Sequence, residues 1–219
     1  MDVYATEEEQ AEQVKKWLKE NGPAILIGLV LGLGGLSGWR YWQNSQRVQA
    51  EAASSAFEHL TAFVQAGKID QARNFGDKVI GDFPKSTYAE FTALTLAKLA
   101  VEKKDFADAT KRLQWVVDHG KLPELKRLAK LRLARVLLAE GKVDEAWRAV
   151  QDISDKPASG ALSELKGDIL VAQGKTDEAR RQYLEATVQA GNKDPNETDT
   201  LAMKLNNLGT TPASDSKSP

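Results

Sequence analysis

Very few side chains in this sequence of 219 residues have the types and spacing that catalysis or metal binding requires. Each of the two histidines, His59 and His119, is alone in its segment, without a second histidine or a paired carboxylate at metal-site spacing. There is no cysteine, which excludes disulfides, thiolate metal sites and cysteine nucleophiles. The sequence also lacks a Gly-rich phosphate loop and a nucleophile–base–acid arrangement. We therefore predict a protein that is not an enzyme and binds no metal or cofactor.

Basic residues gather in one stretch, KLPELKRLAKLRLAR at residues 121–135, where Lys126, Arg127, Lys130 and Arg135 interleave with leucines. The pattern fits a solvated amphipathic helix. It also fits a surface for acidic clients, anionic lipid head groups or an acidic partner domain. No aromatic residue interleaves with these charges, and the formal net charge of the chain is -1, so we predict no nucleic-acid binding.

The elements that would position such side chains repeat along the chain. Four related phrases recur at spacings of 37, 37 and 33 residues: AGKIDQA ending at Ala72, EKKDFADA at Ala109, EGKVDEA at Ala146 and QGKTDEA at Ala179. We expect each phrase to be the turn between two helices. In three of them a glycine is expected to end the first helix in the left-handed conformation: Gly67, Gly141 and Gly174. An aspartate then offers an N-cap near the second helix: Asp70, Asp144 and Asp177.

Positions at fixed distances from the four alanines predict how the helices pack. Twelve residues before each alanine the residue is small in three of four units, as tight packing between paired helices requires: Leu60, Ala97, Ala134 and Gly167. Seven residues after each alanine the residue is apolar: Val79, Val116, Ile153 and Ala186. The chain is thus predicted to be a series of helix–turn–helix units.

These units resemble the tetratricopeptide repeat, and the match is best at residues 164–186, ELKGDILVAQGKTDEARRQYLEA. The resemblance implies an all-α solenoid whose neighbouring pairs share a core and whose first helices line a concave groove. Matching motif positions place five candidate partner-binding residues there: Phe91, Lys98, Leu128, Arg135 and Asp168. The alternative is ordinary inter-helix packing for the two apolar residues and a solvated groove wall for the three charged ones. A last helix is expected to cover the end of the array with Leu201, Leu205 and Leu208.

A long apolar run, GPAILIGLVLGLGGLSGWRYW, occupies residues 22–42. The seventeen residues from Pro23 to Trp39 carry no charge, and as a helix they would span roughly 26 Å. The residues before the run hold six acids and three lysines, and GWRYWQ at its end is a poor cleavage site. We therefore favour an all-α chain with a single uncleaved N-terminal transmembrane helix over a cleaved export signal or a buried core helix. Aromatic residues flank the run as at membrane interfaces: Trp17, Trp39, Tyr41 and Trp42.

Small residues recur every four positions in this run, at Ala24, Gly28 and Gly32. They form a face on which another membrane helix could approach closely. Plain tolerance of glycine in lipid explains them equally well, so both interpretations stay open.

Taken together, YATEEEQAEQVKKWLKENG, the run GLVLGLGGLSGWRYWQ and the four repeats resemble the YfgM family of bacterial inner-membrane proteins, ancillary subunits of the SecYEG translocon. The resemblance implies that the signal anchor at 22–42 separates a cytoplasmic tail at 1–21 from a periplasmic repeat domain at 43–208. The composition of residues 209–219 predicts a disordered tail. The implied partners are SecYEG, a PpiD-like periplasmic chaperone and secreted client chains. Two alternatives are a regulator of the Rcs envelope stress response that sequesters one of its components, and an assembly factor for an envelope complex.

Overall fold

The computed structural model of the chain describes residues 7–153, 160–190 and 195–209, and their regular secondary structure is entirely α-helical. The helices are, in chain order, α1 (Glu7–Gln65), α2 (Ile69–Asp82), α3 (Thr87–Glu102), α4 (Phe106–His119), α5 (Pro123–Ala139), α6 (Val143–Val150), α7 (Gly160–Ala172), α8 (Thr176–Ala190) and α9 (Pro195–Asn207). The predicted all-α class is therefore confirmed. The chain divides into two compact units, Met1–Ala52 and Ala53–Pro219, which we call the N-terminal unit and the repeat unit.

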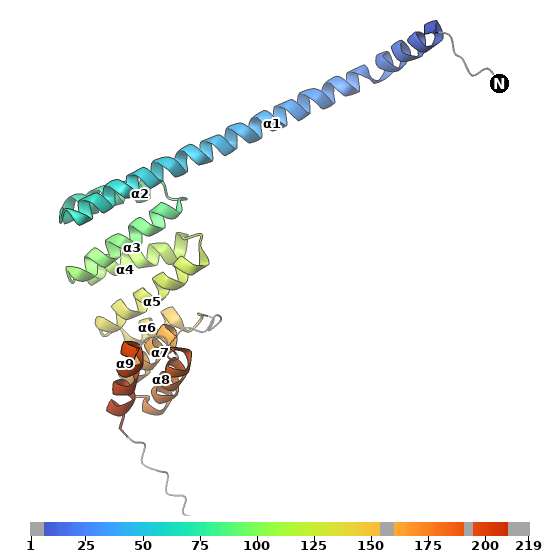
Figure 1. Cartoon of the computed structure of the whole chain (residues 1–219). Helices are drawn as coiled ribbons and strands as arrows, with labels where there is room; N and C mark the ends of the chain where they lie inside the picture. The colour runs from blue at the N-terminus through green and yellow to red at the C-terminus, as the bar shows by residue number, and fades with distance from the viewer. Residues whose placement is uncertain (1–6, 154–159, 191–194, 210–219) are drawn as a thin grey trace, which may run out of the picture. The chain divides into compact units, whose positions relative to one another are not determined.

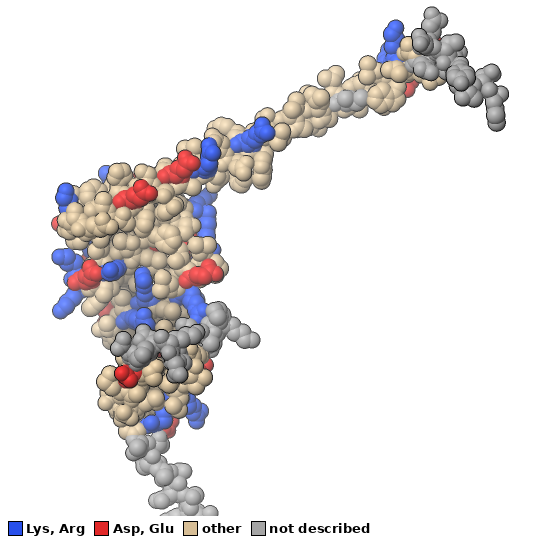
Figure 2. All heavy atoms as spheres, in the orientation of Figure 1, with Lys and Arg blue, Asp and Glu red and all other residues tan. Residues whose placement is uncertain are grey.

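The N-terminal unit consists of the greater part of α1. The helix has two pieces, Ala11–Ala24 and Leu26–Gln65, which meet at a bend of 42°. The bend follows Pro23, whose ring removes one backbone hydrogen bond and displaces the preceding turn. Among the described residues no single helix has the length and apolar composition to cross a membrane, whereas these two pieces taken together do. A long stretch of the helix shows neither basic nor acidic side chains (Figure 2).

The repeat unit is a row of helix pairs in chain order (Figure 1). The end of α1 pairs with α2 through a cluster that contains Leu60 and Ala72, and the later pairs are α3 with α4, α5 with α6 and α7 with α8. First helices of successive pairs also contact one another, α3 with α5 and α5 with α7. The eight positions at fixed distances from the four alanines, including Gly167, are all buried, and so are the alanines themselves. The spacing of the four phrases thus gave the packing of the pairs correctly.

The turns inside the pairs adopt the predicted left-handed geometry. Gly67, Gly141 and Gly174 have φ values of 68°, 75° and 77°. Glycine is favoured there because a Cβ would collide with the following carbonyl oxygen. In the second pair Lys104 takes this place with a φ of 59°.

The three predicted N-caps are wrong, because Asp177 lies inside the first turn of α8, and the other two aspartates lie inside the first turns of α2 and α6. Helices α2 and α6 begin after Lys68 and Lys142, without a side-chain cap, and Asp70 and Asp144 lie inside their first turns. There the carboxylates lie near the positive end of the helix dipole. A true cap occurs in α4, where Asp105 accepts a hydrogen bond of 3.1 Å from the backbone N–H of Asp108.

The core runs through the repeat unit from pair to pair. Its largest cluster contains Leu113, Leu162 and Ile169, each at most 1% exposed, and burial of such a side chain stabilises the fold by about 2 kcal/mol. At the far end Leu201 of α9 is fully buried against Tyr183 and Ala186, with Leu205 and Leu208 beside it. The predicted terminal capping helix is therefore confirmed, whereas residues 210–219 of the predicted disordered tail lie outside the described residues.

Candidate partner-binding groove

Three aromatic rings meet where the end of α1 faces the beginning of α3. The ring centroids of Phe57, Tyr88 and Phe91 lie 5.9 to 6.2 Å apart, in tilted and edge-to-face arrangements. Ser86 fixes the start of α3 because its hydroxyl accepts a hydrogen bond of 3.2 Å from the N–H of Tyr88. The rings are only half-buried, so they leave an apolar surface open to solvent.

Two adjoining cavities extend from these rings along α3 and α5. The first has a volume of about 590 Å³ and is lined by first helices alone, with Leu94, Leu125 and Leu128 among its apolar residues. The second has a volume of about 430 Å³ and adds apolar side chains such as Val101 and Val136. Both are lined by Lys98, Glu102 and Arg132. We call these two cavities together the α3–α5 groove.

The charged wall of the groove is basic. Lys98 lies 3.8 Å from Glu102 with both side chains largely exposed, so this ion pair adds little stability. Arg132 and Arg135 are exposed on α5, and among the described residues neither makes an ion pair or a hydrogen bond. Three cations and one carboxylate give the groove a charge of +2, against -1 for the whole chain. In Figure 2 Lys and Arg side chains, with some Asp and Glu side chains among them, lie over the region that α3 to α5 occupy in Figure 1.

A buried carboxylate holds α5 in place opposite α3. Glu90 of α3 is 2% exposed, and its Oε1 accepts a hydrogen bond of 2.9 Å from the backbone N–H of Lys121, in the link between α4 and α5. Two residues further on, Pro123 starts α5, where its missing N–H costs nothing. The contact sets where α5 begins, and so sets the position of Leu125 and Leu128 across from Phe91.

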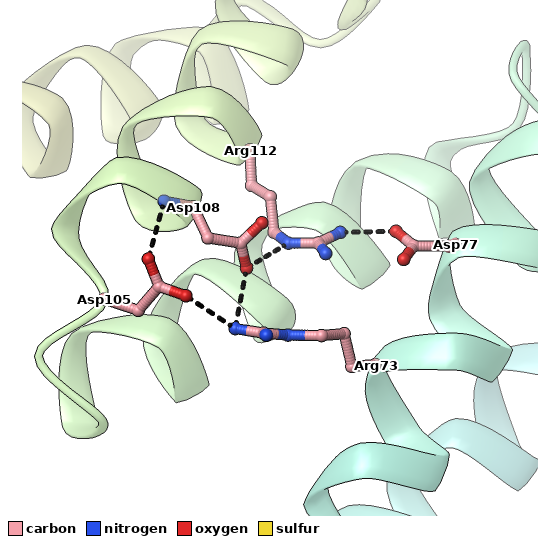
Figure 3. A network of polar contacts seen from close by, with 5 residues as sticks. All are labelled: Arg73, Asp77, Asp105, Asp108 and Arg112. Carbon is pink, nitrogen blue, oxygen red and sulfur yellow. Dashed lines mark hydrogen bonds and ion pairs between the residues drawn. The ribbon is translucent and has the colours of Figure 1, made fainter.

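An ionic network joins the second helices of the first two pairs (Figure 3). Arg112 of α4 donates to Asp108 at 2.9 Å and to Asp77 of α2 at 2.7 Å. Arg73 of α2 donates to Asp105 at 3.0 Å and lies 3.2 Å from Asp108. The N–H of Asp108 and then the guanidinium of Arg73 hold the pKa of Asp105 below its ordinary value. Because Arg112 is 8% exposed, this network fixes α2 against α4.

The structure gathers three of the five predicted partner-binding residues in one cavity and places a fourth beside it. Phe91, Lys98 and Leu128 line the first cavity, and Arg135 lines the second together with Lys98. Asp168 lies on neither lining.

Asp168 instead belongs to a polar network at the end of the array. Its Oδ1 accepts hydrogen bonds from the Tyr183 hydroxyl at 2.8 Å and from Nζ of Lys204 at 2.7 Å. Lys204 also donates to Glu164 at 2.6 Å, which ties α9 to α7. The three charged side chains are 20 to 30% exposed, so this carboxylate already has partners within the fold.

Sequence reasoning missed Phe57 and Arg132, which line the groove with the predicted residues. The signal for Arg132 was present, because it lies one helical turn after Leu128 and three residues before Arg135, on the same face of α5. Phe57 could not be placed in this way, because the first repeat departs most from the pattern.

The histidines contact aromatic rings and do not form a site. The His59 ring lies 6.4 Å from that of Phe75, and the His119 ring stacks on Trp115 at 5.2 Å. Among the residues that the structure describes, no three or more His, Asp or Glu side chains are arranged to hold a metal ion.

The fold and the open apolar groove define a helical-repeat protein of the kind that binds other polypeptides, and they fit a non-enzymatic role. Residues 15–210 match the model of the tetratricopeptide repeat-like domain family. An ancillary SecYEG translocon subunit of Escherichia coli (strain K12) is 33% identical over 211 residues, 95% of this chain and 99% of the relative. Proteins with the same description from Haemophilus influenzae and Neisseria gonorrhoeae are 34% and 27% identical, over 94% and 95% of this chain and the full length of each relative. The chain therefore belongs to the family of ancillary SecYEG translocon subunits, with a tetratricopeptide repeat-like domain.

Proposed function

We propose that this chain is a non-enzymatic, membrane-tethered adaptor at the exit of the Sec translocon. In this role the repeat unit binds a periplasmic chaperone similar to PpiD and helps to pass secreted proteins to periplasmic chaperones. The observation that carries the proposal is the similarity, over almost the whole chain, to relatives named as ancillary SecYEG translocon subunits. The α3–α5 groove supports it, because an open apolar surface between repeat helices is suited to a polypeptide.

The membrane part of the proposal is a signal anchor at residues 22–42, with 1–21 in the cytoplasm and 43–208 in the periplasm. Apolar side chains of this part of α1 are uncovered in the structure: Leu26, Val30 and Leu31 are 64 to 70% exposed. Such a contiguous apolar surface is costly in water and favourable in lipid. Ala24 is exposed, and nothing lies within 4 Å of where a Cβ would stand on Gly28 or Gly32, so this face is open to a translocon helix.

Site-specific photocrosslinking in intact inner membranes tests the proposal. Probes replace Gly28 in the anchor and Phe91, Leu128 or Arg135 in the groove, and adducts are identified by mass spectrometry. A matched probe at Lys111, exposed on α4 and outside the groove, is the control. We expect translocon subunits at Gly28 and a chaperone or nascent chains at the groove positions. Capture of lipid or a second copy alone at Gly28, with an unrelated envelope protein at the groove, would refute the translocon role.

The membrane topology can be tested by labelling single introduced cysteines, because the chain has no cysteine of its own that would also react. Single cysteines replace Lys19 or Lys111, and intact spheroplasts are treated with a membrane-impermeant maleimide. Labelling at Lys111→Cys but not at Lys19→Cys until the cells are lysed is the expected result. The reverse pattern would place the repeat unit in the cytoplasm and end the periplasmic proposal.

A further inference from the structure

We propose that the α3–α5 groove is specific for a partner segment in which apolar side chains are followed by two or more carboxylates. The inference rests on the proposed adaptor function and names the chemistry of the polypeptide that this groove binds. It follows from two properties of the groove. One end is apolar and the other is basic, and two arginines at the basic end have no partner among the described residues.

The end of the groove near the beginning of α3 selects apolar side chains. Phe57 and Phe91 form its wall, and Leu94, Leu125 and Leu128 continue the lining. Half-buried rings with centroids about 6 Å apart present faces and edges to which an incoming aromatic or branched side chain can pack. No charged side chain is among these five residues, so an acidic group entering here would lose its hydration without gaining a partner.

The other end selects carboxylates. Arg132 and Arg135 lie three residues apart on one face of α5, next to Lys98 of α3, and the guanidinium groups have no partner among the described residues. A guanidinium can bind a carboxylate through two parallel N–H donors, which gives direction as well as attraction. The floor beneath these cations is apolar, with Val101, Leu113 and Val136, so a carboxylate there is screened less than one in open water.

The length of the groove sets the spacing in the ligand. The cation Lys98 lies seven positions after Phe91 on α3, and Arg135 lies seven positions after Leu128 on α5, which corresponds to roughly 10 Å along each helix axis. An extended segment covers that distance in about three residues and a helical one in about seven. The apolar anchor and the carboxylates of the partner should therefore be separated by one of these two intervals.

An anionic membrane surface is a competing ligand for the basic end. Lipid head groups would need only the cations, whereas here the cations border two adjoining cavities with apolar walls. A polypeptide uses both features together, so we favour it.

The test uses the full-length protein in detergent and four fluorescent synthetic peptides. Two peptides carry Phe-Leu followed by Glu-Glu, at intervals of about three and about seven residues, and two matched peptides carry Gln-Gln instead. The variant Arg132→Gln/Arg135→Gln removes the two charges, and Lys111→Gln/Arg181→Gln removes two exposed charges outside the groove. Circular dichroism confirms that both variants are folded before binding is measured.

We expect one Glu-Glu peptide to bind about tenfold more tightly than its Gln-Gln counterpart, and this preference to vanish in the groove variant but not in the control. Equal affinity for the Glu-Glu and Gln-Gln peptides would overturn the proposal, and so would failure of all four to bind. Vesicles of phosphatidylglycerol are tested in parallel. If the groove variant loses binding to vesicles and keeps the peptide preference, the arginines serve lipid and the inference is wrong.

Photocrosslinking from Leu128 in membranes separates this inference from the adaptor function. With a chaperone or client adduct present, sequencing of the crosslinked peptide should reveal carboxylates at the stated interval, and Arg132→Gln/Arg135→Gln should reduce the adduct about tenfold. An adduct that is insensitive to the variant, or mapped to a segment without acids, refutes the acidic specificity while the adaptor role stands. Absence of any translocon-associated adduct refutes the adaptor role itself.

Discussion

Substitution of Gly167 by alanine tests the closest approach between helices in the repeat unit. A Cβ at this position of α7 would stand 2.6 Å from Cδ1 of Tyr183 and still closer to Cε1. Those atoms belong to a rigid ring that is 3% exposed, so the ring must move as a whole. Its hydroxyl donates to Asp168 at 2.8 Å, and a shifted ring loses this bond as well.

The expected cost follows from three opposing contributions. Alanine favours the helix by about 1 kcal/mol over glycine. Overpacking against the ring costs about 1–3 kcal/mol, and the weakened hydrogen bond to a carboxylate costs about 1.5 kcal/mol. We therefore expect Gly167→Ala to destabilise the α7–α9 region by about 2 kcal/mol.

Hydrogen exchange of the α7–α9 amides in the full-length protein measures this effect locally, as a repeat array requires. A loss of about 2 kcal/mol corresponds to roughly 30-fold faster exchange. Gly81→Ala in α2 is the control, because nothing lies within 4 Å of its Cβ position, and it should be neutral or slightly stabilising. Unchanged or slower exchange in Gly167→Ala would show that the close approach of the Tyr183 ring does not make a side chain at position 167 destabilising. A cost that persists undiminished in a Tyr183→Leu background would exclude the ring as its cause.

Three further predictions concern a turn and two polar networks. Lys104→Gly should stabilise the protein by about 0.5–1 kcal/mol in urea unfolding, since glycine adopts its left-handed φ without strain, whereas Gly141→Ala at the equivalent turn should cost about 1 kcal/mol. Because the folded-state pKa of Asp105 is lowered, its stabilising effect is present above the ordinary value of 3.8 and is lost as pH falls below it. Asp105→Asn should therefore reduce the loss of stability between pH 5 and pH 2, monitored by circular dichroism; an identical acid profile would contradict this assignment. Lys204→Met should cost about 2 kcal/mol by leaving two carboxylates without their ion pair, and hydrogen exchange should accelerate in α9 while α3 is unaffected.

Much of the fold could be predicted because it depends on local rules. A left-handed turn needs glycine, and Gly67, Gly141 and Gly174 marked three of the four turns. Close helix packing needs small side chains at fixed intervals, and those intervals identified buried positions such as Ala97 and Gly167. Neither inference required knowledge of which helices meet.

The features that sequence reasoning missed depend on contacts between distant residues. An N-cap depends on where the helix starts, and a shift of two residues moved Asp70 from the predicted cap into the first turn. Lys204 donates a hydrogen bond to Asp168 although the two residues are 36 positions apart in the sequence. The repeat motif therefore gave no sign that this carboxylate already has a partner within the fold. Arg132 was overlooked because the motif, and not the helical face, was used to select groove residues.

The contacts that hold the groove together are separate from the side chains that line its basic end. Glu90 sets α5 against α3, and Arg112 fixes α2 against α4, and both side chains are buried. Arg132 and Arg135, in contrast, are exposed and have no polar partner among the described residues, so their replacement removes no ion pair or hydrogen bond. The buried polar contacts of Glu90 and Arg112 do not involve the residues that line the groove. The lining residues can therefore be changed without breaking these contacts. Binding and stability should therefore respond to different substitutions, which allows the specificity of the groove to be measured in folded protein.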